Sequence, residues 1–173
     1  SRRVRSSAAS DVYKRQDMLL TNAAADINKP RGSVESLDDV TAIFKAQPEE
    51  TMLNFLKASI KTNKEETEDI KKLHQAYSDG RFEELIPLLE ETEQRTLKLV
   101  DTKYAKAMSD WLKNDLLIRR NLAWLPEIRK QSAKQSTLFA VGIAHLPSEK
   151  GLIELLRQEG YQVTPEPKVL IWQ

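Results

Sequence analysis

The chain has 173 residues, of which 40% are hydrophobic and 31% are charged, and this composition is typical of a globular domain rather than a disordered chain. It has no cysteine, which excludes disulfides, thiolate metal sites and cysteine nucleophiles. Only five glycines and seven prolines are present, which favours helices over a turn-rich β fold. No apolar run approaches the roughly 20 residues that a membrane helix needs, so the sequence predicts no membrane span.

The formal net charge of +1 hides an uneven distribution. Residues 1–16 carry +4, from five basic residues and Asp11, so the remaining 157 residues carry −3. Outside the first segment no basic bias is left that would indicate a nucleic-acid partner. We therefore expect no nucleic-acid binding.

The first 16 residues lack apolar periodicity, and residues 7–16 resemble the translated adaptor read found at the edges of assembled metagenomic reading frames. The alternative is a basic targeting arm, but the segment has no hydrophobic core of the kind a secretory signal needs. We expect a non-native leader over residues 1–16 and a single domain over residues 17–173. The native N-terminal sequence would then be missing, which makes the chain a C-terminal fragment.

The first predicted helix covers residues 17–28 and ends before Pro30, which cannot continue it. Residues 31–35 follow and are either a strand that ends at Glu35 or a surface loop. Ser36 is a favourable N-cap for the next helix, because acidic residues fill its first turn.

A large helical layer is predicted from about residue 37 to residue 130. Pro48 opens one of its helices, whose charged run over residues 61–72 is typical of a solvated face. Residues 93–130 are almost all helix-forming, with candidate breaks near Asp101 and Asn114. Arg120 and Asn121 lie between apolar groups of this stretch. They are expected to be partly buried with a polar partner, for which an interhelical salt bridge is the simplest explanation.

The last third of the chain predicts strands. Residues 137–143 are continuously apolar, as in a strand covered on both faces, and would deliver His145 to the end where a helix over residues 148–159 begins. Residues 161–171 alternate around two prolines, as in an edge strand or two short strands. The predicted fold class is α/β, α+β-like in this fragment and predominantly helical. A small sheet forms from the chain ends, near residues 32–35, 137–143 and 161–171, and the helical layer is a large insertion.

Motifs that would identify a chemistry directly are missing. The sequence has no glycine-rich phosphate loop, no nucleophile elbow and no H-E-x-x-H helix. With two histidines, His74 and His145, a three-histidine metal site is impossible. His74 is interpreted as an ordinary helical residue, and the residues alone leave open whether His145 is a ligand.

Several separated stretches together resemble the TraB/GumN family, which includes the Tiki metalloproteases. The G-x-x-H of Gly142 and His145 is followed by a G-L-x-x-L-L stretch from Gly151 and a G-Y-x-V stretch from Gly160. Upstream, residues 117–128 resemble the family's L-x-x-R-N-x-x-W helix. Lys29-Pro30 and Val34-Glu35-Ser36 resemble its K-P and L-E-T segment. The resemblance covers about residues 17–173.

The resemblance implies an α/β core with a helical insertion and, in some members, metal-dependent hydrolase chemistry at a site built from two G-x-x-H motifs, a glutamate and an arginine. On this chain these are Gly142 with His145, Glu35, and Arg120 with Asn121 beside it. The first G-x-x-H has no counterpart and would lie before residue 17, so the site is predicted to be truncated. The chain also has Ser148 where the family often has glycine, and Val40 where it has glutamine.

We expect Glu35, Arg120 and His145 to be the catalytic residues, supported by Gly142 and Asn121. His145 and Glu35 are suitable ligands for Mn, Co or Zn, and Arg120 would hold a substrate carbonyl or carboxylate. The expected substrate is a peptide or protein, and the resemblance implies an exported, periplasmic or lipoprotein-anchored location. The alternative is a non-catalytic interaction protein in which the three residues form a structural polar cluster. The catalytic interpretation requires them to converge within ~10 Å around one cavity, a scale set by metal–ligand bonds.

Overall fold

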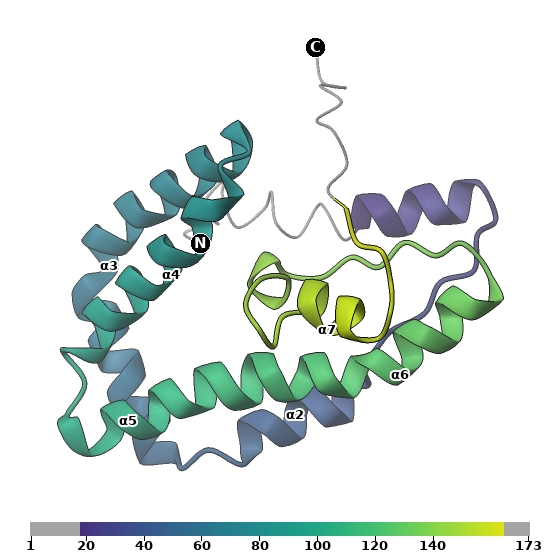
Figure 1. The fold of residues 1–173 in the computed structure, drawn as a ribbon. Helices are drawn as coiled ribbons and strands as arrows, with labels where there is room; N and C mark the ends of the chain where they lie inside the picture. Colours follow the sequence, from purple (N-terminus) through teal and green to yellow (C-terminus); the bar gives the residue numbers. More distant parts are fainter. Residues whose placement is uncertain (1–17, 165–173) are drawn as a thin grey trace, which may run out of the picture.

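The computed structural model of the protein describes residues 18–164, apart from the side chains of residues 62–67 and 82–83. This part of the chain is helical and contains no strand (Figure 1). A helix over residues 18–26 comes first. The elements after it are α2 (Leu37–Lys45), α3 (Glu49–Asp79), α4 (Phe82–Leu97), α5 (Thr102–Asp110), the π-helix η1 (Trp111–Ile118), α6 (Arg119–Lys134), the 3-10 helix η2 (Ile143–His145) and α7 (Leu152–Gln158).

Two long helical units define the shape. Helices α3 and α4 form an antiparallel hairpin, while α5, η1 and α6 run on from one another as one rod (Figure 1). Helix α7 and the loop before it lie along α6 (Figure 1). The predicted break near Asn114 is therefore a change to π-helical winding within a continuous helix, whereas the chain does leave helical structure between Leu97 and Thr102.

The helix ends follow the capping signals of the sequence. Ser36 and Asp39 form a capping box, in which the Asp39 backbone N–H donates to the Ser36 hydroxyl and the Ser36 backbone N–H donates to the Asp39 carboxylate. Helix α3 begins directly after Pro48 and ends at Gly80, whose φ of 68° lies in the left-handed region that glycine adopts readily.

Two hydrophobic clusters hold the elements together. The first joins α2, α3, α5 and η1 and is centred on Met108 and Trp111, whose indole N–H donates to the carbonyl of Ile43. The second joins α6 to α7 through five buried side chains, and Phe139 and Val141 of the intervening loop pack against it. The members buried in this second cluster are Trp124, Leu125, Ile128, Leu152 and Leu155. It positions the loop that carries His145.

A buried polar contact joins α3 to α4. The Asp69 carboxylate is only 5% exposed and accepts from Arg95 Nη1 at 2.6 Å and from Thr92 Oγ1 at 3.3 Å. Asp69 belongs to the charged run of residues 61–72, which the sequence predicted to be a solvated face. That prediction is wrong at Asp69, because a charge of this run faces the partner helix and is paired there.

The predicted α/β fold is also wrong for the described residues. Residues 32–35 form a loop, residues 137–142 are irregular without a paired strand, and His145 ends a 3-10 helix rather than following a strand. A strand exists only where a neighbouring strand completes its backbone hydrogen bonds, and an apolar run cannot specify that partner. Phe139 and Val141 face the α6–α7 cluster while Leu138 is 78% exposed, so the run is covered on one face only.

Two further predictions concern the ends of the chain. Residues 161–164 have no regular structure, and residues 165–171 of the third predicted strand lie outside the described residues. The predicted leader, residues 1–16, lies outside them as well. Between residues 18 and 164, none of the helices combines the length and the apolar character needed to cross a membrane.

Replacing Gly151 by alanine should destabilise the fold by about 3 kcal/mol, because the added Cβ would lie 1.9 Å from the Pro147 carbonyl oxygen and 2.4 Å from that of Leu146. Gly32→Ala is the matched control, since nothing lies within 4 Å of a Cβ built there. Urea denaturation measures both changes. Equal stability of the two variants would contradict the close packing of this turn.

Candidate functional site

Three segments that are far apart in the sequence meet at one polar cluster. Glu35 precedes α2, Arg120 lies in the first turn of α6, and His145 ends η2. Arg120 Nη2 donates to Glu35 Oε1 at 2.5 Å and Arg120 Nε donates to Glu35 Oε2 at 3.0 Å, which makes the pair bidentate. Arg120 Nη1 lies 3.4 Å from His145 Nε2. The predicted catalytic residues therefore converge well within the expected distance.

Trp124 contacts all three of these residues and was not among the predicted site residues. Its indole N–H donates to Glu35 Oε2 at 3.0 Å. Its ring centroid lies 4.5 Å from that of His145 and 4.9 Å from Arg120 Cζ. The sequence signal was its position four residues after Arg120, which places both side chains on one face of a helix.

Asn121 is the buried support of the histidine. It is 2% exposed, and its Nδ2 donates to the Lys150 carbonyl at 2.8 Å and to the His145 carbonyl at 3.3 Å. Its Oδ1 lies 2.7 Å from His145 Nδ1. The structure thus brings Asn121, predicted as a supporting residue, to the cluster, where it contacts both the ring and the backbone of His145.

Local structure explains how α6 presents these side chains. The π-helix η1 ends directly before Arg119, whose backbone N–H donates to the Asn114 carbonyl in the wider i−5 pattern. Arg120 Nη1 donates to the Leu116 carbonyl in η1 at 3.1 Å, which orients the guanidinium along the helix. At Gly142, predicted as supporting, an added Cβ would meet only His145 Cδ2, at an ordinary 3.6 Å.

The charges of the cluster follow from its contacts. The hydrogen bond from Arg120 lowers the pKa of Glu35, against the opposing effect of burial. Burial, followed by the charge of Arg120, lowers the pKa of His145 to about 4, while Glu35 acts in the opposite direction. At neutral pH the cluster therefore consists of a carboxylate, a guanidinium and a neutral imidazole.

Glu35 and His145 are donors of the kinds that divalent transition metals take. Across residues 18–164, however, no group of three or more His, Cys, Asp or Glu side chains is placed to hold an ion. The Arg120 guanidinium contacts both donors. The described residues thus offer two possible donors, and Arg120 occupies both of them in this structure.

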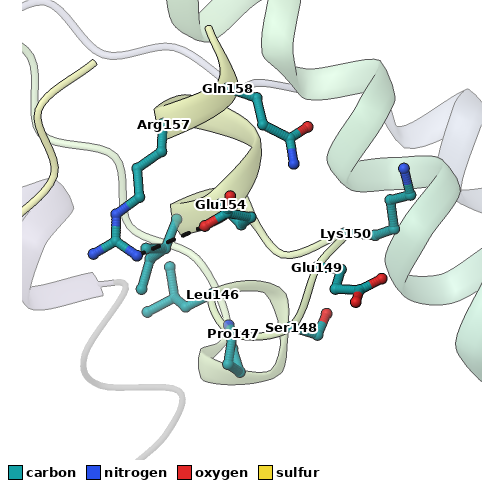
Figure 2. A pocket seen from close by; sticks show the side chains of 9 residues that line it. Leu146, Pro147, Ser148, Glu149, Lys150, Glu154, Arg157 and Gln158 are labelled. Carbon is teal, nitrogen blue, oxygen red and sulfur yellow. Dashed lines mark ion pairs between the residues drawn. The ribbon is translucent and has the colours of Figure 1, made fainter. Parts of the chain in front are cut away.

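A separate hollow of about 550 Å³ lies beside α7 (Figure 2). Its lining includes Glu149, Lys150, Glu154 and Arg157, and Arg157 pairs with Glu154 at 3.7 Å (Figure 2). None of Glu35, Arg120 and His145 lines it, so this hollow is not the shared cavity that the catalytic interpretation requires. Its charges are of mixed sign, and we do not assign the candidate chemistry to it.

Comparison with models of known protein families shows which family this chain belongs to. The model of the TraB/PrgY/gumN family matches residues 3–165. The chain belongs to this family. A search of curated proteins and a search of solved structures each found no match. The TraB/PrgY/gumN match confirms the resemblance inferred from the motifs, and it includes Glu35, Arg120 and His145.

Acid should destabilise this TraB/PrgY/gumN chain in two steps. The native pKa of His145, about 4, lies below its unfolded value of 6.5, so only the unfolded chain takes up this proton as the pH falls from 6.5 toward 4. The resulting loss of stability is about 2 kcal/mol, allowing for solvent screening. The pKa of Glu35 is also lowered, so its contribution is present above pH 4.5 and is lost on further acidification.

Urea denaturation at pH 7 and pH 5 tests the first step, because ordinary carboxylates stay ionised in this window. His145→Asn is the control, since it keeps an amide N–H for Asn121 but does not titrate. The wild type should lose stability between the two pH values, and the variant should lose much less. A wild type with equal stability at both would contradict the neutral, buried imidazole.

Arg120→Met should cost about 2–3 kcal/mol, because it leaves Glu35 unpaired although that side chain is only 20% exposed. Arg119→Met is the matched control: Arg119 is 72% exposed and lies 3.7 Å from Asp115, so the loss should be within about 0.5 kcal/mol. Chemical denaturation compares the two variants. Similar small losses would show that the bidentate pair contributes little to stability.

Proposed function

We propose that this chain carries part of the site of a metal-dependent hydrolase that acts on peptides or proteins. Glu35 and His145 would be two of the donors to a divalent transition metal (Mn, Co or Zn), and Arg120 would bind the substrate's carbonyl or carboxylate. The observation that supports the proposal is the convergence of these three side chains from segments 85 and 25 residues away from Arg120.

The protonation states support these roles. Metals bind ionised carboxylates and neutral imidazoles, which are the forms of Glu35 and His145 at neutral pH. When bound, such an ion supplies a Lewis acid and an activated water. Arg120 cannot act as a base because it stays protonated, but its planar array of N–H donors suits a carbonyl or carboxylate.

Arg120 has to exchange partners in this proposal. Both of its Glu35 contacts use carboxylate oxygens that a metal would also need. A guanidinium released from Glu35 by an ion would be free to donate to substrate. A further donor would be the histidine of the first G-x-x-H motif that the family resemblance implies. Family membership is consistent with an exported, periplasmic or lipoprotein-anchored protein.

A non-catalytic interaction protein is the second candidate. Its supporting observation is that the polar groups of the cluster find their hydrogen-bond partners within the cluster. Glu35 binds Arg120 and Trp124, and each ring nitrogen of His145 has a polar neighbour. Among the described residues, no buried side-chain nitrogen or oxygen lacks a hydrogen-bond partner. In this case the cluster would fix the α2, α6 and α7 segments to one another, and the helical layer would bind a partner.

Metal titration separates the two candidates. The protein is titrated with Co²⁺ and followed by calorimetry and visible absorption. We expect His145→Ala to weaken binding by more than tenfold, and the matched His74→Ala, at an exposed residue, to leave it unchanged. Equal affinity of the wild type and His145→Ala would remove His145 as a ligand and favour the structural cluster.

A further inference from the structure

The carboxamide of Asn121 has only one favourable orientation. Both hydrogens of its Nδ2 are used, on the carbonyl oxygens of Lys150 at 2.8 Å and His145 at 3.3 Å. Turning the amide over would place Oδ1 against those two oxygens and leave neither of them with a donor. Oδ1 therefore faces His145 Nδ1, 2.7 Å away. Because a carbonyl oxygen only accepts, Nδ1 must carry the proton.

The contact at the other ring nitrogen, Nε2, indicates the same tautomer independently. Arg120 Nη1 lies 3.4 Å from His145 Nε2, and a guanidinium has donors but no acceptor. Nε2 can face it favourably only as a bare lone pair. Two consecutive residues of α6 thus face the two nitrogens of one imidazole and assign the same tautomer.

We propose that Asn121 is a positioning residue that holds His145 in the Nδ1–H tautomer and so presents Nε2 as the nitrogen available to an electrophile or a metal ion. Neutral histidine in water prefers the opposite tautomer, with the proton on Nε2, so the contact with Asn121 imposes the state. A hydrogen bond from one nitrogen sets which nitrogen is free to bind. The assignment of the tautomer stands on these contacts alone, and only the use of Nε2 rests on the proposed function.

The tautomer can be read directly by NMR. The chain has two histidines, and His74 is exposed, so ring-¹⁵N-histidine labelling gives one buried signal set and one solvated reference. Long-range ¹H–¹⁵N correlations at pH 7.5 distinguish protonated from bare ring nitrogens. We expect His145 to show a protonated Nδ1 and a bare Nε2. A protonated Nε2, or averaged signals like those of His74, would overturn the proposal.

Two variants test whether Asn121 determines the tautomer of His145. Asn121→Leu removes the acceptor, and the His145 signals should move toward the averaged pattern. Arg120→Met leaves the Asn121 contacts in place and should keep the Nδ1–H pattern. An unchanged pattern in a folded Asn121→Leu, judged by circular dichroism, would remove Asn121 as the determinant. If Asn121→Leu does not fold, the Arg120→Met variant decides the question. Loss of the Nδ1–H pattern in that variant would show that Arg120, and not Asn121, determines the tautomer.

Zn²⁺ added to the labelled wild type then tests the use of Nε2. Direct binding should shift the Nε2 signal strongly and leave Nδ1 protonated. A tautomer as proposed, combined with no response to Zn²⁺, would refute the metal role while leaving the role of Asn121 intact. A Zn²⁺ shift on Nδ1 instead would overturn the proposal that Nε2 is the binding nitrogen.

Discussion

The bidentate pair between Glu35 and Arg120 is the contact on which the arrangement of the cluster depends. It joins the loop before α2 to the start of α6 across 85 residues of sequence. The two side chains are about four-fifths buried, so neither charge is well solvated without the other. Trp124 extends the pair to His145, because its N–H contacts the carboxylate while its ring contacts the imidazole.

Helix α6 contributes to both the second hydrophobic cluster and the polar cluster. Its apolar residues pack against α7, and its polar residues Arg120 and Asn121 meet the loop that α7 and Phe139 hold in place. The imidazole is consequently fixed by packing on one side and by hydrogen bonds on the other. This is the kind of support that a reactive side chain needs, although a structural cluster would need it too.

The sequence predicted the helices well because their signals are local. Ser36 and Pro48 act within one turn of the chain, and each is found at the helix start that it indicated. The strand predictions were wrong because a strand depends on a partner that is distant in the sequence. The apolar run from residue 137 specifies burial, but a sheet requires a second segment at the right distance, and none pairs with it within residues 18–164. Asp69 shows the same limit, since its partner Arg95 lies on another helix.

Family membership could be inferred from the sequence, because the motifs and their spacing can be read without knowledge of the fold. The same motifs nominated Glu35, Arg120, Asn121 and His145 as candidate site residues. The tertiary structure alone decided that Arg120 pairs with Glu35, that Trp124 links the carboxylate to the imidazole, and that Asn121 faces Nδ1. Sequence order sets which side chains share a helix face. Which oxygen meets which nitrogen depends on how α6 packs against the loops before α2 and α7, and that packing is a property of the whole fold.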